Sequence, residues 1–270
     1  MTNQADFKQY LALDRLPHLW CPGCGHGTIL KAIFLGLAEL GVPKEKALLA
    51  TGIGCSGRAG DYVACHRFQG THGRTLAFAT GIKLARPELT TVCLMGDGDS
   101  AAIGAGHLVH AARRNIDLTA VVANNFNYGM TGGQYSPLTP EGSITSSSRS
   151  GKAEPDMDIC RLAEACGANY VVRTTAYHVV EIRRFIKEAV LQKGFSLVEV
   201  LSPCPTYFGR YNQLGGAPEM VERFKENAVP LERYAKMSEE ERAGHTWRGR
   251  LVSRGRPDFL SRYRETYGGP

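Results

Sequence analysis

Four of the eight cysteines lie where their thiolates could share a metal centre. Cys21 and Cys24 form a Cys-x-x-Cys pair at the predicted start of a helix, where the helix dipole favours thiolates. Cys55 and Cys204 stand at predicted strand ends, in the segments Gly-Ile-Gly-Cys-Ser-Gly and Ser-Pro-Cys-Pro. Four such thiolates suit either Zn²⁺ or an iron–sulfur cluster. A thioredoxin-like redox pair would explain only the first two cysteines.

The other four cysteines do not share this pattern. Cys93 falls inside an apolar strand, and Cys160 and Cys166 fall inside a helix, so we expect three buried, small apolar side chains. Cys65 is assigned a structural role. Eight cysteines in 270 residues are too few for a disulfide scaffold.

A second group of polar residues follows two apolar runs. Gly96-Asp97-Gly98-Asp99 comes directly after Thr-Thr-Val-Cys-Leu-Met, and Asn124-Asn125 ends the next run. The carboxyl ends of neighbouring parallel strands line one crevice, where ligands bind. A carboxylate and an amide oxygen suit Mg²⁺, which shares its ligand sphere with phosphates, and the glycines let the backbone approach a diphosphate. A tight turn beside an Asn-rich loop is the alternative, and the strand–helix–strand context favours the ligand site.

Two further side chains are candidates for contact with a reacting molecule. His72, in Thr-His-Gly-Arg before a predicted helix, could donate a hydrogen bond to a diphosphate or to a reacting oxygen. Its alternative role is that of a histidine satisfied within its own turn. Arg58 could bind a substrate carboxylate with two hydrogen bonds, and a surface salt bridge is the alternative. His107 and His110 are expected to be structural.

The elements that position these residues alternate between short apolar runs and helical segments. This alternation predicts an α/β fold with a mostly parallel sheet flanked by helices. The predicted strands are residues 48–54, 90–95, 118–124, 170–174 and 195–201. The predicted helices are residues 27–40, 76–84, 101–114, 157–166 and 178–192.

Two segments differ from the rest in composition. Residues 132–154 are rich in serine and nearly free of apolar side chains, which predicts a long and functional loop. From residue 217 onward, 20 of the last 54 residues are charged. We therefore expect an α/β domain over residues 1–216 and a peripheral, extended C-terminal tail over residues 217–270.

The overall composition excludes several classes of protein. Hydrophobic residues make up 43% and charged residues 21%, as in globular proteins, so wholesale disorder is excluded. The net charge of +6 fits an anionic cofactor, an acidic partner or simple solubility equally well. The segment from Trp247 to Arg264 is the one candidate for a basic stripe with interleaved aromatic residues, and we expect no nucleic-acid partner. Neither a secretory signal nor a membrane-length apolar run is visible. We expect a soluble protein of the cytoplasm without a membrane partner.

Taken together, the motifs resemble those of one family. Six motifs occur in a fixed order from Trp20 to Asn212. They are Cys-Pro-Gly-Cys-Gly, Gly-Ile-Gly-Cys-Ser-Gly-Arg, Thr-His-Gly-Arg, Gly-Asp-Gly-Asp with Asn-Asn, Tyr-Gly-Met-Thr-Gly-Gly-Gln-Tyr-Ser-Pro-Leu-Thr-Pro and Ser-Pro-Cys-Pro-Thr-Tyr-Phe-Gly-Arg-Tyr-Asn. The set is similar to that of the β subunits of 2-oxoacid:ferredoxin oxidoreductases, above all to the 2-oxoglutarate type. The resemblance implies a thiamine-diphosphate-binding fold.

The resemblance also implies a cofactor inventory and its ligands. Thiamine diphosphate, Mg²⁺ and one 4Fe-4S cluster are expected, with the cluster on Cys21, Cys24, Cys55 and Cys204. Asp97, the side chain of Asn125 and the backbone carbonyl of Asn127 are expected to bind Mg²⁺. The predicted cofactor-binding residues are Gly54, Cys55, Ser56, His72, Gly73, Gly96, Asp97, Gly98, Asp99, Asn125, Asn127, Tyr128, Gly129, Met130 and Thr131.

The implied reaction is the reversible, coenzyme A-dependent oxidative decarboxylation of 2-oxoglutarate to succinyl-coenzyme A. Electrons would pass through the cluster to ferredoxin, and the family also runs in the direction of reductive carboxylation. An α subunit is the expected partner, in a heteromer, because it contributes the acid that activates the thiamine pyrimidine. Pyruvate or another 2-oxoacid remains an alternative substrate. A non-redox thiamine decarboxylase or synthase, and a zinc-stabilised binding module, are the rival classes.

Overall fold

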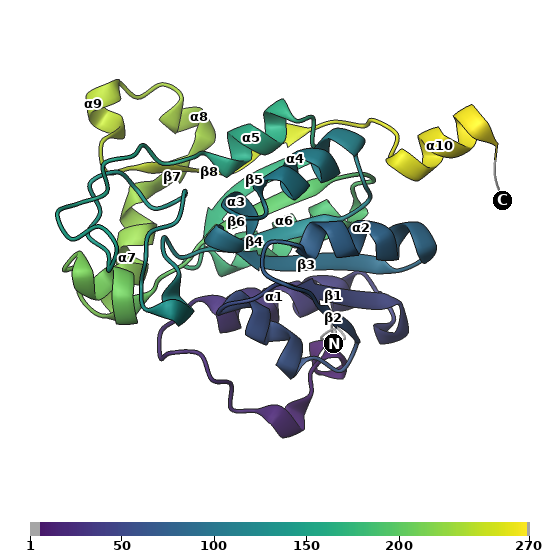
Figure 1. The fold of residues 1–270 in the computed structure, drawn as a ribbon, viewed down its shortest axis with the longest axis horizontal. Helices are drawn as coiled ribbons and strands as arrows, with labels where there is room; N and C mark the ends of the chain where they lie inside the picture. Colours follow the sequence, from purple (N-terminus) through teal and green to yellow (C-terminus); the bar gives the residue numbers. More distant parts are fainter. Residues whose placement is uncertain (1–5, 269–270) are drawn as a thin grey trace, which may run out of the picture.

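The computed structural model describes residues 6–268, which form an eight-stranded sheet with helices on both faces (Figure 1). In chain order the strands are β1 (Ala47–Thr51), β2 (His66–Gln69), β3 (Thr90–Gly96), β4 (Thr119–Asn124), β5 (Tyr170–Thr175), β6 (Ser196–Leu201), β7 (Ala228–Pro230) and β8 (Thr246–Ser253). Their order in the sheet is β2–β1–β3–β4–β6–β5–β8–β7. All neighbouring pairs are parallel except β5 and β8. The predicted mostly parallel α/β fold is confirmed.

Two layers of helices cover the sheet, one on each face. The helices are α1 (His26–Glu39), α2 (Thr75–Ala85), α3 (Asp97–Ala101), α4 (Ala105–Arg114), α5 (Ile159–Ala165), α6 (Val179–Leu191), α7 (Ala217–Asn227), α8 (Leu231–Tyr234), α9 (Glu239–Arg242) and α10 (Phe259–Tyr267). Buried residues of α1 and α6 pack on one face of the sheet, and those of α2, α4 and α5 pack on the other. No helix within residues 6–268 is long and apolar enough to cross a membrane.

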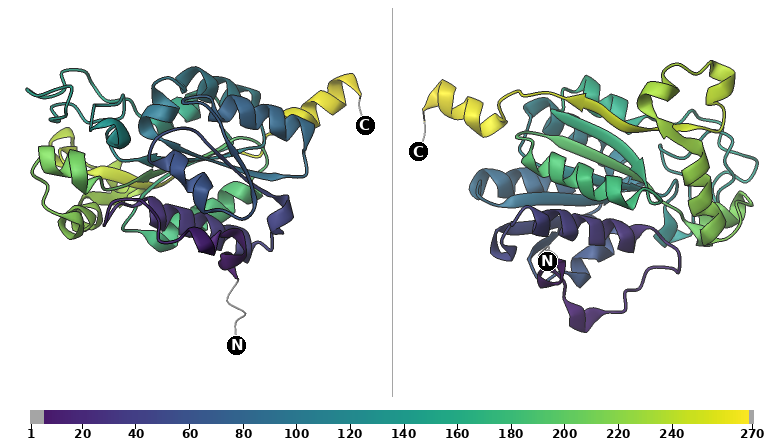
Figure 2. Two further views of the ribbon diagram at one scale, coloured as in Figure 1. Left: turned by 60° about the horizontal axis from the view of Figure 1, so that its bottom comes forward. Right: turned by 180° about the vertical axis from the view of Figure 1, so that it is seen from behind.

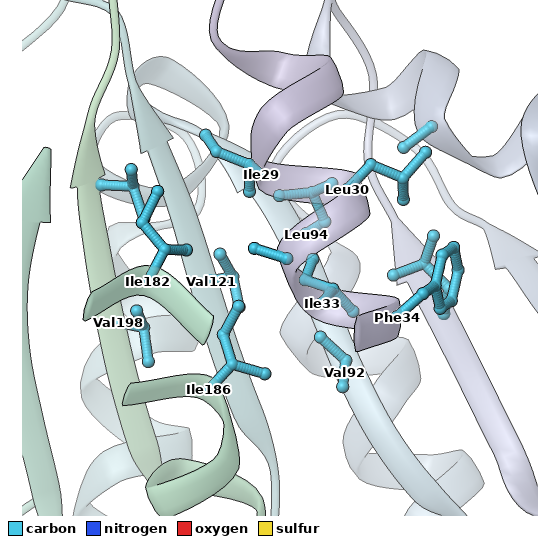
Figure 3. Packing of buried hydrophobic residues seen from close by; sticks show 14 of the residues in the cluster. Ile29, Leu30, Ile33, Phe34, Val92, Leu94, Val121, Ile182, Ile186 and Val198 are labelled. Carbon is cyan, nitrogen blue, oxygen red and sulfur yellow. The ribbon is translucent and has the colours of Figure 1, made fainter. Parts of the chain in front are cut away.

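Alternate residues of each central strand enter opposite cores. In β3, Val92 and Leu94 face α1 and α6, whereas Cys93 and Met95 face α2 and α4. Figure 3 shows the first of these cores, with Ile33 of α1 packed among strand residues. Because both faces are covered, the strands read as continuous apolar runs. Each fully buried side chain of this size contributes about 1.5–3 kcal/mol to folding.

All five predicted strands are present, with ends shifted by at most a few residues. The first ends at Thr51 and not at Gly54, because the chain turns there towards the site described below. The predicted helix over residues 101–114 is wrong in its first part: α3 ends at Ala101 and α4 begins at Ala105. A β-carbon at Gly104 would lie 2.1 Å from the carbonyl oxygen of Asp99, so the chain turns sharply at this point.

The C-terminal segment is not wholly peripheral, in contrast to the expected tail over residues 217–270. Strand β8 pairs with β5, and Trp247 and Val252 of β8 are buried in the core beside α5. Arg248 and Arg250 of β8, in a segment rich in charge, hid this strand from the sequence pattern. α10 matches the expected extension, since it has no buried residue and stands away from the body (Figure 2).

Candidate functional site

The predicted cofactor-binding residues meet where β1, β3 and β4 end. These strands are neighbours in the sheet, and all three point the same way. The loops that follow these strands, together with His26 and His72, enclose a cavity of about 230 Å³, which we call the Asp97 cavity. It is lined by His26, Ile53, Gly54, Cys55, Ser56, His72, Gly96, Asp97, Gly98, Asp99, Asn125, Asn127, Tyr128, Gly129, Met130 and Thr131. Every predicted cofactor-binding residue except Gly73 is among them.

Asp97 begins α3 and is buried. Its Oδ2 accepts a hydrogen bond of 2.6 Å from the Ser136 hydroxyl, which comes from the serine-containing loop after Gly132. Burial raises the pKa of Asp97 to about 7, because its charged form is separated from water. A carboxylate in this position gains much from a nearby cation, and a divalent ion is a suitable one.

Asp99 serves a different purpose from Asp97. Its Oδ1 accepts a hydrogen bond of 2.5 Å from the backbone N–H of Gly73 and lies 2.9 Å from His72 Nδ1. The Thr75 hydroxyl donates to Oδ2 at 3.4 Å. A β-carbon at Gly52 would lie 2.0 Å from Oδ2, so glycine is required there. The Asp99 carboxylate therefore fixes the turn that places His72 beside the cavity.

The loop after β4 carries Asn125 and Asn127, both buried. The Asn127 side chain donates to the carbonyl of Asn125 at 2.7 Å, and the carbonyl of Asn127 accepts from Gly129 N–H at 3.0 Å. A carbonyl oxygen has a second lone pair, so this bond leaves one available for a ligand. Together with Asp97, the two residues provide the all-oxygen donor set that Mg²⁺ prefers.

A second cavity, the cysteine cavity, adjoins the first. It measures about 300 Å³ and is lined by Leu19, Trp20, Cys21, Cys24, Cys55, Arg58, Asn125, Gly129, Met130, Cys204, Pro205, Thr206 and Tyr207. Cys55, Asn125, Gly129 and Met130 belong to both walls. The four cysteines with metal-binding contexts are thus brought together, whereas Cys93 and Cys160 are buried in the core, as expected.

The geometry of the cysteine cavity bears on what it could hold. Within residues 6–268, no three Cys, His, Asp or Glu side chains converge tightly enough to bind a single metal ion. A lone Zn²⁺ would need its sulfur ligands about 2.3 Å away on all sides. Four cysteines spread around a larger cavity suit a polynuclear group better, because each thiolate then binds a different metal atom.

His26 lies between the two cavities. It is buried, it lines the Asp97 cavity, and its Nδ1 is 2.9 Å from Cys24 Sγ. Burial lowers the pKa of His26 to about 4, so the ring is neutral near pH 7. Trp20 stacks on this ring at 5.8 Å and donates a hydrogen bond of 2.7 Å to the carbonyl of Cys55.

Arg58, the candidate for binding a substrate carboxylate, does not line the Asp97 cavity. It borders the cysteine cavity, and its guanidinium is 2.8 Å from the carboxylate of Asp61. The alternative of a surface salt bridge describes this contact. A role for Arg58 in binding a substrate carboxylate stays a prediction.

Sequence reasoning missed several residues around the Asp97 cavity. Ile53 lines the cavity and lies inside the motif Gly-Ile-Gly-Cys-Ser-Gly-Arg, yet it was not among the predicted site residues. Ser136 and Thr139 support the site from behind: Thr139 donates to the carbonyl of Phe126 at 2.6 Å and accepts from Ser136 N–H at 2.8 Å. Both lie in the segment Ser-Pro-Leu-Thr-Pro, whose prolines and hydroxyl groups were the available signal.

Comparison with known proteins identifies the family. The family model described as thiamine pyrophosphate enzyme, C-terminal TPP binding domain, matches residues 52–200. The chain is 45% identical over 256 residues to "2-oxoglutarate synthase subunit KorB" of Methanothermobacter marburgensis, covering 95% of this chain and 90% of that protein. It is also 44% identical over 190 residues to "2-oxoacid:ferredoxin oxidoreductase subunit beta" of Saccharolobus solfataricus, covering 70% of this chain and 62% of that protein.

The chain belongs to the β subunits of the 2-oxoacid:ferredoxin oxidoreductases. A solved structure of 2-oxoglutarate:ferredoxin oxidoreductase from Magnetococcus marinus agrees, with a TM-score of 0.86 and 33% identity over 100% of this chain and 93% of that chain. The resemblance stated from the motifs is confirmed, as is the thiamine-diphosphate-binding fold. This member of the family is a thiamine diphosphate enzyme.

Proposed function

We propose that this chain is the β subunit of a coenzyme A-dependent enzyme that oxidatively decarboxylates 2-oxoglutarate, reversibly, to succinyl-coenzyme A and CO₂. Electrons leave through one 4Fe-4S cluster to ferredoxin. The observation that carries the proposal is that the two cavities share a wall. A cofactor bound in the Asp97 cavity would therefore lie next to a metal group bound in the cysteine cavity.

In this proposal the Asp97 cavity binds the diphosphate of the cofactor through Mg²⁺. Asp97, the Asn125 side chain and the Asn127 carbonyl supply the protein oxygens, and Gly98 lets the Tyr128 ring pack directly against the backbone beside Asp97. When bound, thiamine diphosphate supplies the electron sink that lets a 2-oxoacid lose CO₂. His72, held by Asp99 at 2.9 Å, presents the other side of its ring to a phosphate or reacting oxygen.

The cysteine cavity holds the cluster through Cys21, Cys24, Cys55 and Cys204. Support comes from the convergence of these four on one cavity and from the lack of a tighter site for a single ion among residues 6–268. His26 and Cys55 lie where the two groups would be closest. Electron transfer out of the Asp97 cavity then needs no large movement of the chain.

The choice of 2-oxoglutarate is supported by named relatives. The four similar proteins called 2-oxoglutarate synthase subunit KorB are 43–52% identical to this chain. The related solved structure contains 2-oxoglutarate, coenzyme A and succinyl-coenzyme A. Pyruvate and other 2-oxoacids are the alternative substrates, and their turnover is to be compared with that of 2-oxoglutarate.

An α subunit completes the active site in this proposal. Apolar side chains stay exposed beside both cavities: Leu19 is 75% exposed, Met130 51% and Ile53 44%. Thiamine chemistry needs water kept from the reacting carbon, and a partner that covers these side chains would exclude it. The loop over residues 132–154 and the segment over residues 217–270 are the expected contact regions.

The test compares the β chain alone with the β chain co-expressed with its α subunit, both purified without oxygen. We expect brown protein in both and 2-oxoglutarate-dependent, coenzyme A-dependent viologen reduction only with the α subunit. Activity of the β chain alone would remove the partner from the proposal. A colourless, iron-free and active enzyme would replace the redox reaction by simple decarboxylation, and faster turnover of pyruvate would change the substrate.

A further inference from the structure

A buried charged network lies behind the Asn125–Asn127 loop. Glu199, in the centre of β6, is 1% exposed, and its Oε2 accepts a hydrogen bond of 2.6 Å from Arg173 Nε on β5. The Arg173 guanidinium also lies 2.9 Å from Asp158, the N-cap of α5, and 4.3 Å from the centre of the Trp247 ring on β8. Burying a charged pair is no more stabilising than apolar packing of the same volume, so its presence calls for a further reason.

Asn124 connects this network to the loop. Its Nδ2 donates a hydrogen bond of 2.8 Å to Glu199 Oε1, and its Oδ1 accepts one of 3.1 Å from the backbone N–H of Phe126. The amide is therefore fixed in one orientation, with its donor towards the carboxylate and its acceptor towards the loop. If it rotated by half a turn, a donor would face the Phe126 N–H.

Phe126 is the point at which the loop needs this support. It adopts a φ of +63°, a left-handed conformation that costs a non-glycine residue about 1–3 kcal/mol. The Thr139 hydroxyl holds its carbonyl at 2.6 Å, and Asn124 holds its N–H. Asn125 and Asn127, on either side, receive their positions from this turn.

We infer that Glu199 and Arg173 are positioning residues, which set the orientation of the Asn124 amide and through it the two asparagines that face the cofactor. Arg173 fixes the direction of the Glu199 carboxylate, Glu199 orients Asn124, and Asn124 holds the Phe126 turn. Trp247 packs on Arg173 from β8, so the C-terminal segment also contacts this network. The inference rests on the proposed role of Asn125 and Asn127 in binding Mg²⁺ and the diphosphate.

Exchanging the carboxylate of Glu199 and the amide of Asn124 between the two positions tests the inference. In Glu199→Gln, the new amide oxygen faces the Arg173 donor, and its NH₂ then faces the NH₂ of Asn124. Asn124 either keeps this unfavourable contact between two donors or rotates and loses the hydrogen bond from the Phe126 N–H. In Asn124→Asp, a second carboxylate faces Glu199. In the double variant, the Gln NH₂ donates to the Asp carboxylate, whose other oxygen accepts from Phe126. Every bond is then restored, and donor and acceptor are exchanged only between positions 124 and 199.

The measurement is the dissociation constant of thiamine diphosphate with Mg²⁺, by calorimetry on the cofactor-stripped complex with the α subunit. We expect each single variant to raise it at least about tenfold, as for one unsatisfied buried polar group, and the double variant to return it to within about threefold of the wild type. Cys160→Ala is the matched control, because Cys160 Sγ contacts Glu199 Oε2 at 3.3 Å and reaches neither Asn124 nor the loop. It should bind as the wild type does, even if its melting temperature falls.

The outcomes separate the inference from the proposed function. Single variants with wild-type affinity overturn the inference, and so does a double variant that binds no better than the worse single one. If Glu199→Gln does not fold, Asn124→Asp and the double variant still decide the question. A wild-type complex that binds thiamine diphosphate equally well without Mg²⁺ refutes the proposed metal site, whatever the variants do.

Discussion

The two cavities share a wall but are built in different ways. Around the Asp97 cavity the polar side chains are already bonded to one another: Asp97 to Ser136, Asp99 to Gly73, and Asn127 to the Asn125 carbonyl. Around the cysteine cavity the sulfur atoms make few contacts, with Cys24 near His26 and Cys204 donating weakly to Asn127 Oδ1 at 3.7 Å. One site is organised by the protein itself, and the other needs its metal group to complete it.

Electrostatics sharpens this contrast. Burial raises the pKa of Cys24 to about 12 and that of Cys55 to about 11, so both are neutral thiols near pH 7 when the cavity is empty of metal. A metal group binds thiolates and displaces these protons, which couples its insertion to local ordering of the chain. The Asp97 cavity keeps its shape without such a step. Substitutions of residues that line only one cavity should therefore leave the other nearly unchanged.

The largest effect is expected from Asp97→Ala. Because it removes the charged ligand of the proposed Mg²⁺ site, Mg²⁺-dependent binding of thiamine diphosphate should fall below detection in calorimetry. Visible absorption from the cluster should stay at the wild-type level. Asp61→Ala, which removes a half-buried carboxylate that pairs with Arg58 and does not line the Asp97 cavity, is the control and should bind thiamine diphosphate normally. Wild-type affinity in the Asp97 variant would take this residue out of the site.

Cys204→Ser is the corresponding change in the cysteine cavity. Serine is a poor ligand for iron, so most of the iron and of the broad visible absorption should be lost, while thiamine diphosphate still binds. Iron analysis and spectra of protein purified without oxygen provide the measurement. Unchanged iron content would show that Cys204 is not a ligand.

A moderate effect is expected from Asp99→Asn. The amide keeps the size of the side chain, but only one of its two polar atoms can accept a hydrogen bond and the negative charge beside His72 is lost, so the turn at His72 should loosen. We expect about a tenfold loss of thiamine diphosphate affinity, the equivalent of roughly 1.4 kcal/mol, with the cluster intact. An affinity equal to that of the wild type would mean that the His72 turn does not depend on Asp99.

The smallest effect on either cavity is expected from Cys93→Ala. Cys93 is fully buried in β3 on the face opposite α1. Loss of one sulfur atom from a packed core should lower the free energy of unfolding by about 1 kcal/mol. Iron content and thiamine diphosphate affinity should both equal those of the wild type, and a loss of iron would add a fifth cysteine to the question of ligation.

The same contrast explains what the sequence could predict. Asp97 and Asn125 were expected to meet because they follow strands buried on both faces, and strands of that kind lie parallel with their ends on one edge. The bond from Ser136 to Asp97 could not be predicted, because it joins residues 39 positions apart through an irregular loop. The Glu199 network was hidden in the same way, since one glutamate in an apolar strand reveals no partner.

Strand β8 was not predicted from the sequence, for another reason. Its arginines alternate with apolar residues, and in a charged segment the pattern indicated a solvated tail. Arg248 and Arg250 lie beside glutamates of α6, and Trp247 and Val252 turn into the core. The pairing of β8 with β5 provides the burial that the sequence pattern alone did not indicate.

That pairing also has a consequence for synthesis on the ribosome. β5 is covered on one side by β6 and on the other by β8, which begins about 70 residues later. At about 5–20 residues per second, translation needs roughly 4–14 s to reach β8 after β5 is made. During this interval β5 is a free sheet edge, able to pair with other nascent chains. Slow codons between residues 217 and 245 would lengthen the interval and increase misassembly.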